Sequence, residues 1–387
     1  MFGFVMVSDF LVIGGGMAGA SAGYFLAASG SVTLLEMENA PGYHSTGRSA
    51  ALFSEYYGNR AVRALTTASR RFFAAPPPGF GGPLLAPRGV LTLCPAGADE
   101  RFAAVLAEGL PAPTPVREIE IGEVQQYCPI VRPGWYSRAM VKPAAMDVDV
   151  NAVHQGFLRG IRARGGRVLT SAKVRGLVRR AGLWRAVSDL GEFGAPTVVN
   201  AGGAWADELA RLADVRQIGL TPMRRTAFLA DPPDGVHAAG WPMVADVTET
   251  FYFKPESGAL LISPADATPV PPGDARPDDL DVAIAAERVQ EATTLVIRHV
   301  RHAWAGLRSS VADDSPVVGE APDAAGFIWL AALSGYGVQT APAVGRIAAA
   351  LATSAQRRDY PAYLSDLSDL SDLGIDLDDI APGRCFG

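Results

Sequence analysis

A glycine cluster between two short apolar runs near the N-terminus most constrains what this chain can fold into. The segment Asp9-Phe-Leu-Val-Ile-Gly-Gly-Gly-Met-Ala-Gly19 carries a G-x-G-x-x-G pattern at Gly14, Gly16 and Gly19, directly after an apolar run. The first glycine permits a tight turn, the second lets a pyrophosphate approach the backbone, and the third lets helix and strand pack closely. Glu36 ends the next apolar run, where a ribose diol would bind. The pattern predicts strand, turn, helix and strand forming a dinucleotide site.

The stretch Phe10–Leu35 also carries no charge, so a membrane-spanning helix is the competing interpretation. Its apolar residues fall in two short runs around small residues, and buried parallel strands need no polar alternation. We therefore favour the strand interpretation. Met1–Ser8 lacks a basic start and a small-residue cleavage site, so we expect no signal peptide.

Composition limits the class of protein and of partner. The 387 residues are 49% hydrophobic and only 19% charged, which predicts two or three compact folding units. A net charge of -6 argues against nucleic acid and anionic membranes as partners. Cys94, Cys128 and Cys385 are widely spaced and no histidine has metal-ligand spacing, so we expect neither disulfides nor a metal site, and a cytoplasmic location.

The segment after Glu36, Asn39-Ala-Pro-Gly-Tyr-His-Ser-Thr-Gly-Arg-Ser-Ala-Ala51, is a small-residue, hydroxyl-rich loop that could contact an extended dinucleotide. With the glycine pattern, it resembles the D-amino acid oxidase and glycine oxidase superfamily of FAD enzymes, and within it the bacterial D-arginine dehydrogenases. The resemblance implies an α/β fold: a Rossmann-like FAD-binding domain of the GR2/DAO type, and a discontinuous antiparallel-sheet substrate domain.

Three later blocks carry the same resemblance: Val198–Trp205, Trp304–Arg308 with Pro316–Gly319, and Ala331–Thr340. Because they lie far from the first glycines, we predict an FAD-binding domain assembled from residues 1–82, 146–219 and 305–387. Aromatic and β-branched runs between Pro and Gly turns predict a substrate domain from residues 83–145 and 220–304. We also predict a helix over Asp281–Val300 and a surface turn or tail at the Ser-Asp-Leu repeat of Leu364–Leu373.

The resemblance implies non-covalent FAD and a set of cofactor contacts. The implied residues are Gly14, Gly16, Ala18, Gly19, Glu36, Met37, Ser45, Thr46, Gly47, Arg48, Ser49, Ala51, Val174, Ala201, Gly202, Trp205, Gly306, Ser334, Tyr336, Gly337 and Val338. The Gly335-Tyr-Gly337 turn, opening a helix, could place backbone N–H groups against the negative charge of a reduced flavin. His44 lies in the flavin loop and is either a ring contact or, as a minor alternative, a covalent attachment point.

For the substrate, the resemblance implies that Arg308 clamps the carboxylate of an amino acid, because a planar guanidinium suits a planar carboxylate. Arg225, Tyr252 and Tyr57 are its implied helpers and, with Arg308, the candidate catalytic residues. Arg224 would point away from Arg225 if both lie on a strand. The other pocket residues that the resemblance implies are Ala50, Leu52, Val90, Gly335 and Gln339.

Two of these positions depart from the D-arginine dehydrogenase pattern. Leu52 replaces a histidine, and Val90 replaces the glutamate that receives the substrate guanidinium. An unpaired guanidinium against Val90 would cost about 2–4 kcal/mol, or roughly 30- to 1000-fold in specificity. We therefore expect neutral, apolar or aromatic D-amino acids rather than cationic ones.

The resemblance implies hydride transfer from the substrate Cα to flavin N5 in a D-amino-acid dehydrogenase or oxidase, giving a 2-oxo acid and ammonia after hydrolysis. No strong base is required if the amine loses its proton first. The electron acceptor, oxygen or a quinone or another carrier, stays open. One alternative is an oxidase or demethylase of N-methyl amino acids such as sarcosine, and another is a non-catalytic flavin-binding protein.

Overall fold

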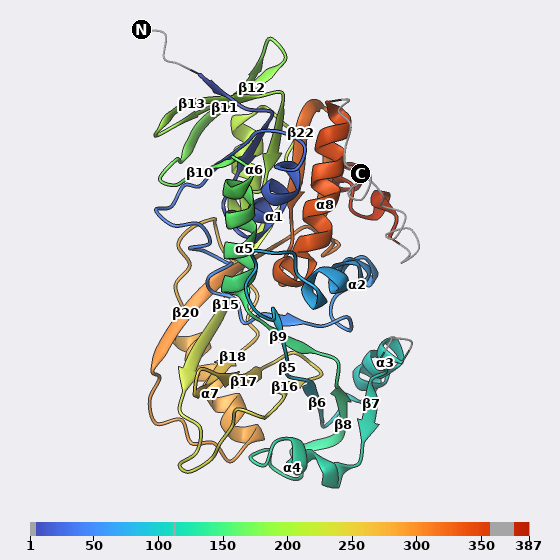
Figure 1. Ribbon diagram of the computed structural model, residues 1–387. Coiled ribbons are helices and arrows are strands. Elements are labelled where there is room, and N and C mark those ends of the chain that lie inside the picture. Colours follow the sequence, from blue (N-terminus) through green and yellow to red (C-terminus); the bar gives the residue numbers. More distant parts are fainter. Residues whose placement is uncertain (1–4, 111–113, 357–374, 387) are drawn as a thin grey trace.

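The computed structural model describes residues 5–110, 114–356 and 375–386. Its upper half in Figure 1 is built on a six-stranded sheet with the order β10-β3-β2-β14-β22-β21. All neighbouring strands are parallel except the antiparallel pair β21 and β22. The strands are β2 (Phe10–Ile13), β3 (Val32–Leu35), β10 (Arg167–Leu169), β14 (Thr197–Asn200), β21 (Val317–Ala321) and β22 (Ala324–Ala331).

This sheet is covered on both faces, which explains why its strands carry unbroken apolar runs. Phe10 and Val12 pack on one face with the helices, while Leu11 and Ile13 pack on the other. The first face holds α1 (Met17–Leu26), α2 (Arg60–Ala74), α5 (Val150–Ala163) and α8 (Gly337–Ala355). The second holds α6 (Ala206–Leu212) and a four-stranded sheet of β1 (Met6–Val7), β11 (Val174–Arg180), β12 (Leu183–Ser188) and β13 (Gly191–Ala195).

Helices α1 and α8 pack unusually closely, although more than 300 residues separate them. Ser21 Oγ donates a 2.6 Å hydrogen bond to the carbonyl of Ala341. A Cβ on Gly345 would lie 2.0 Å from that same hydroxyl, so only glycine permits the approach. This contact joins the N-terminal and C-terminal segments in one core.

The lower half of Figure 1 is a nine-stranded sheet with the order β19-β15-β18-β17-β16-β6-β8-β7, and β20 paired with β15. All pairs are antiparallel except β16 with β6. Its strands are β6 (Val90–Pro95), β7 (Arg117–Ile119), β8 (Tyr136–Lys142), β15 (Thr221–Ala230), β16 (Met243–Asp246), β17 (Tyr252–Glu256), β18 (Ala259–Ser263), β19 (Thr268–Pro269) and β20 (His302–Ser310).

One face of this sheet packs against α7 (Asp279–Ala292) in a separate core that includes Phe253 and Ile262. Two helices lie near its far edge, α3 (Asp99–Gly109) and α4 (Val124–Tyr127), and a small sheet joins the halves: β4 (Leu52–Phe53), β5 (Leu85–Pro87) and β9 (Met146–Val148). Short 3-10 turns occupy Ile121–Glu123, Gly203–Trp205, Leu377–Asp379 and Pro382–Phe386. The domain limits stay a prediction, and β20 runs across the limit placed at residue 305.

The helix expected over Asp281–Val300 is shorter than predicted. α7 ends at Ala292, and Thr293 takes an extended conformation while its hydroxyl donates a 2.6 Å bond to the Val289 carbonyl. Val296, whose spacing suggested the longer helix, is 66% exposed. The Leu364–Leu373 repeat lies outside the described residues, and among those described no helix is long and apolar enough to cross a membrane.

Candidate active site

The three fingerprint glycines lie at the turn between β2 and α1, and close contacts explain two of them. Gly14 has φ +108°, and a Cβ there would lie 2.2 Å from the Ala201 carbonyl oxygen. A Cβ on Gly19 would lie 1.9 Å from the carbonyl oxygen of Gly14, so it must be absent for α1 to pack on the turn. At Gly16 only Thr46 Oγ1 comes near, at 3.3 Å, so the backbone there faces open space. A phosphate can reach this helix start.

Glu36 holds the glycine turn from the end of β3. Its Oε2 accepts a 2.7 Å bond from the Gly15 backbone N–H, and its Oε1 accepts a 2.9 Å bond from that of Glu38. Burial raises the pKa of the carboxyl group, while these two backbone donors oppose the rise. Each oxygen keeps a further lone pair, so the carboxylate can also accept from ribose hydroxyls.

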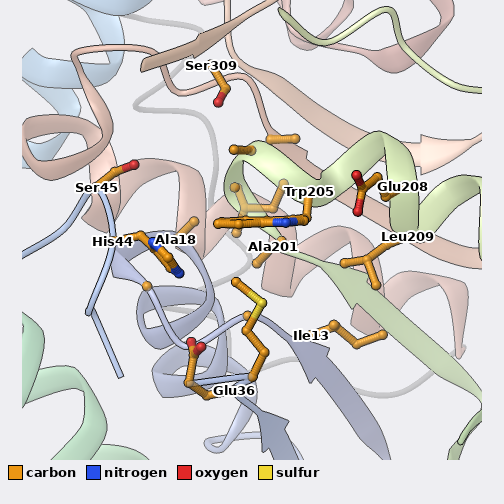
Figure 2. A pocket seen from close by; sticks show the side chains of 18 of the residues that line it. Ile13, Ala18, Glu36, His44, Ser45, Ala201, Trp205, Glu208, Leu209 and Ser309 are labelled. Carbon is orange, nitrogen blue, oxygen red and sulfur yellow. The ribbon is translucent and has the colours of Figure 1, made fainter. Parts of the chain in front are cut away.

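A cavity of about 370 Å³ extends from this turn. In the view of Figure 2, Glu36 and Ser309 lie towards opposite ends of it, with Trp205 and His44 between them. Of the predicted cofactor contacts, those lining it are Gly14, Gly16, Ala18, Glu36, Met37, Ser45, Thr46, Val174, Ala201, Gly202, Trp205, Ser334 and Gly337.

The remaining predicted cofactor contacts lie elsewhere. Arg48, Ser49, Ala51, Gly306 and Val338 line a second, adjoining cavity. Gly19, Gly47 and Tyr336 line neither cavity. Gly47 instead closes a tight turn, because a Cβ there would lie 2.7 Å from the Gly42 carbonyl oxygen.

The loop after Glu36 is fastened to both halves of the molecule. Thr46 Oγ1 accepts a 2.9 Å bond from the Met17 N–H at the start of α1, and Ser45 Oγ donates a 2.7 Å bond to the Leu307 carbonyl of β20. Arg48 pairs with Asp274 and donates to three backbone carbonyls. The loop therefore holds the wall of the first cavity in place relative to β20.

His44 lines the first cavity, and its ring contacts neighbouring side chains. Its Nε2 lies 2.9 Å from Glu38 Oε1, and its ring centroid lies 4.7 Å from that of Trp205. This arrangement fits a ring contact.

The turn before α8 is strained where the two cavities meet. Ala332 and Ser334 have φ of +57° and +44°, in the left-handed region that non-glycine residues avoid. α8 then begins without a side-chain cap, so its first N–H groups stay available to an anionic group. The glycine turn, the Glu36 acceptors and this helix start together fit FAD.

The second cavity, of about 250 Å³, adjoins the first, and both are lined by Met17, Ser45, Thr46, Leu307, Ser334 and Gly337. The structure brings together in it every predicted catalytic and substrate-pocket residue. These are Tyr57, Tyr252, Arg225 and Arg308, with Ala50, Leu52, Val90, Gly335 and Gln339. The Gln339 amide is occupied at both ends, since it donates to Thr66 and accepts from Ser54.

Two arginines enter this cavity from neighbouring strands. Arg308 of β20 donates a 3.3 Å bond from Nη1 to the Tyr57 hydroxyl, and its guanidinium lies against Gly335. Arg225 of β15 also lines the cavity, and its Nε is buried without a hydrogen-bond partner. Burial, and then repulsion from the Arg308 guanidinium, lower the pKa of Arg225. Neither arginine has a carboxylate within 4.0 Å among the described residues.

The neighbouring Arg224 behaves oppositely, as strand alternation requires. It forms ion pairs with Asp266, Asp278 and Asp281 outside the cavity. The contrast shows that Arg225 lacks a partner because of where it points, and not because acids are scarce nearby.

Sequence reasoning missed several residues that line the second cavity, among them Thr92, Lys142, Met243 and Glu249. Lys142 ends β8 directly after three buried residues, and the pairing of β8 with β6 brings it here. The described residues contain no group of three or more His, Cys, Asp or Glu that could hold a metal ion.

The class that this fold and site define is a flavin-dependent oxidoreductase. Residues 9–351 match the DAO family, described as FAD dependent oxidoreductase. The chain belongs to this family, which confirms the family, the fold class and the FAD dependence expected from the sequence.

Individual relatives agree with this assignment. The chain is 25% identical over 365 residues to glycine oxidase of Bacillus licheniformis, which covers 88% of this chain and 92% of that one. It is 24% identical over 410 residues to human mitochondrial dimethylglycine dehydrogenase, covering 97% of this chain but 44% of the relative. A 30% match to the bovine FAD-dependent oxidoreductase domain-containing protein 1 spans 39% of this chain and 34% of that protein.

Among solved structures, glycine oxidase from Geobacillus kaustophilus has a TM-score of 0.81 at 20% identity, covering 93% of this chain and 98% of that one. L-alpha-glycerophosphate oxidase from Mycoplasma pneumoniae, with FAD bound, has a TM-score of 0.82 at 17% identity, covering 90% and 95%. These similarities show the fold.

Proposed function

We propose that the protein is an FAD-dependent D-amino-acid dehydrogenase that converts its substrate to a 2-oxo acid and ammonia. The observation that carries this proposal is the pair Arg308 and Arg225, two cations in one cavity without a carboxylate partner among the described residues. Like charges held together in a partly desolvated site favour an anionic ligand, and a substrate carboxylate can accept from both guanidinium groups.

The residues around the arginines support orientation of the substrate. Tyr57 contacts Arg308 directly, and Tyr252 is nearly buried on β17, beside the same cavity. Bound FAD would accept the hydride, which carries two electrons, from the substrate Cα. The arginines hold the carboxylate, and the apolar walls at Ala50, Leu52 and Val90 exclude water, so the amine can be held in its neutral form.

The same walls support selection against cationic side chains. Val90 is 9% exposed and offers no acceptor to a guanidinium or ammonium group. An unpaired cation there costs about 2–4 kcal/mol, or roughly 30- to 1000-fold in kcat/KM.

Oxidation of an N-substituted glycine at the same site is the second candidate. It is favoured by the glycine oxidase match, which spans nearly the whole of both chains. It uses the same carboxylate clamp but predicts that sarcosine is a better substrate than any D-amino acid with a side chain.

Anaerobic mixing tests both candidates. The FAD-loaded protein is mixed with D-leucine, D-phenylalanine, D-arginine, their L-enantiomers, glycine and sarcosine, and bleaching of the flavin absorbance is followed. Faster bleaching by a D-amino acid than by sarcosine is the expected result. Bleaching by sarcosine alone would favour the second candidate, and no bleaching by any compound would overturn both. Repeating the turnover with a dye and with oxygen then separates a dehydrogenase from an oxidase.

A further inference from the structure

Lys142 lines the second cavity, and the proposed function gives it no role. On β8, Ala139 and Val141 belong to the core shared with α7, whereas Met140 faces the other side. Strand alternation therefore turns Lys142 to the Met140 side. Its Cα pairs with that of Val90 on β6, one strand spacing of about 4.8 Å away. Both residues line the cavity.

The ammonium group of Lys142 has no partner of its own. No hydrogen bond or ion pair joins its Nζ to any described residue within 4.0 Å. Burial lowers the pKa of this ammonium group, and it is a larger cause than any neighbouring charge. Lys254, a nearly buried lysine of the same sheet, shows the usual arrangement: its Nζ lies 3.0 Å from Asp147 Oδ1 and 2.8 Å from Glu256 Oε2. An unpaired lysine in a cavity wall is suited to an anionic ligand.

The carboxylates that line this cavity do not neutralise it. Asp246 accepts from the backbone N–H groups of Thr250 and Phe251 and from the hydroxyls of Thr248 and Thr250, so its oxygens are occupied. Glu249 is exposed to solvent and lies farther than 4.0 Å from Lys142, where it acts only as a distant countercharge.

Lys142 is also separate from the arginine clamp. Between Arg225 on β15 and Lys142 on β8 lie strands β18, β17, β16 and β6. Because four strands separate them, one carboxylate cannot contact both Arg225 and Lys142, although both side chains line the same cavity.

We propose that Lys142 binds an anionic group at the far end of the substrate side chain, so that the preferred substrate is a dicarboxylic amino acid of glutamate length or longer. This inference rests on the proposed function and refines its specificity. Val90 and Leu52 exclude cations, and Lys142 adds attraction for an acid. The expected order is acidic, then neutral, then cationic side chains.

The test compares acids with neutral counterparts of matched length in the FAD-loaded enzyme. D-glutamate and D-glutamine differ only by the charged group, and D-2-aminoadipate extends the acid by one methylene. We expect kcat/KM to favour the acid about 10- to 150-fold, the range of one charge-assisted hydrogen bond. K142M keeps an unbranched side chain one atom shorter and removes its charge, so it should abolish this ratio while oxidation of D-leucine continues.

Two further variants test the direction of the effect. K142E should shift the preference towards D-arginine, and E249Q, which removes the distant countercharge, should raise the ratio of acid to amide. A loss of D-glutamate and D-leucine oxidation in equal proportion in K142M would overturn the proposal, because it would assign Lys142 a structural role. So would a wild-type enzyme that oxidises D-leucine but does not prefer D-glutamate over D-glutamine.

A binding measurement separates failure of this inference from failure of the proposed function. Glutarate and butyrate are titrated into the FAD-loaded wild type and K142M, and the shift of the flavin spectrum is followed. Tighter binding of glutarate by the wild type alone supports Lys142 even if no amino acid bleaches the flavin. Equal affinity for both anions in both proteins overturns it.

Discussion

Replacing Gly335 by alanine should displace the carboxylate clamp without unfolding the protein. A Cβ at this position would lie 2.8 Å from Arg308 Cζ and Nη1, and 3.0 Å from Nε. Ordinary contact between such atoms is about 3.5–4.0 Å, so the guanidinium must move by about 0.7–1.2 Å. All three of these atoms belong to the end of the flexible Arg308 side chain, so the backbone need not change.

The size of the effect follows from this displacement. A shift of about 1 Å in a positioning group can reduce the rate about 100-fold, or about 2.7 kcal/mol. We therefore expect kcat/KM of G335A to fall about 100-fold for any amino acid that reduces the wild-type flavin. FAD content and thermal stability should stay near the wild-type values.

Steady-state kinetics of two control variants show whether the effect of G335A arises from its contact with Arg308. G122A adds a methyl group where nothing lies within 4 Å and should leave kinetics unchanged. In the R308K background the crowded guanidinium is gone, so G335A should cost little more, and the two substitutions should be strongly non-additive. Wild-type kcat/KM in G335A with full FAD content would refute the reasoning.

Three other predictions concern the clamp, the cofactor and acid stability. R308K keeps the charge but loses the planar fork, so kcat/KM should fall at least tenfold with unchanged FAD content, as steady-state kinetics and absorbance will show. E36Q replaces an acceptor by an amide in the cofactor cavity, so the Kd for FAD, measured by fluorescence titration, should rise about tenfold. His154 is buried with Nε2 2.8 Å from the Gly15 carbonyl oxygen, and burial lowers its pKa below the ordinary 6.5. Because the unfolded chain binds the proton more readily, stability should be full above pH 6.5 and fall as the pH drops below it. In urea unfolding at several pH values, H154Q should show a flatter decline over this range.

Sequence patterns were most informative where function and local backbone geometry coincide. Gly14, Gly16 and Gly19 lie within one strand-turn-helix unit, so the pattern alone located the turn, although the atoms nearest to Gly14 and Gly16 belong to Ala201 and Thr46. Arg224 and Arg225 could be separated because strand alternation is also local. The C-terminal end of α7 was harder to predict from the sequence. Thr293 ends the helix because its backbone is extended, whereas the periodic apolar pattern continues to Val296.

Residues whose position depends on distant pairing escaped sequence reasoning. Lys142 reaches the cavity only because β8 pairs with β6, whose sequence lies about 50 residues earlier. Glu249 sits in a loop shaped by the side chain of Asp246, which no periodicity reveals. Val90 and Leu52 alone predict a preference for neutral substrates, whereas the role proposed for Lys142, which pairs with Val90, places acidic substrates first.

The strand order of the six-stranded sheet has a consequence for biosynthesis. β2 lies between β3 and β14, and β14 lies between β2 and β22, so the sheet's centre needs residues near positions 10, 200 and 330. The ribosome makes these segments in that order, so β2 gains its second partner, β14, only after residue 200 has been made, and β14 gains β22 only after residue 331. The nascent chain therefore cannot fold one domain after another, and a truncated product ending before β22 would expose an unpaired apolar edge prone to aggregation.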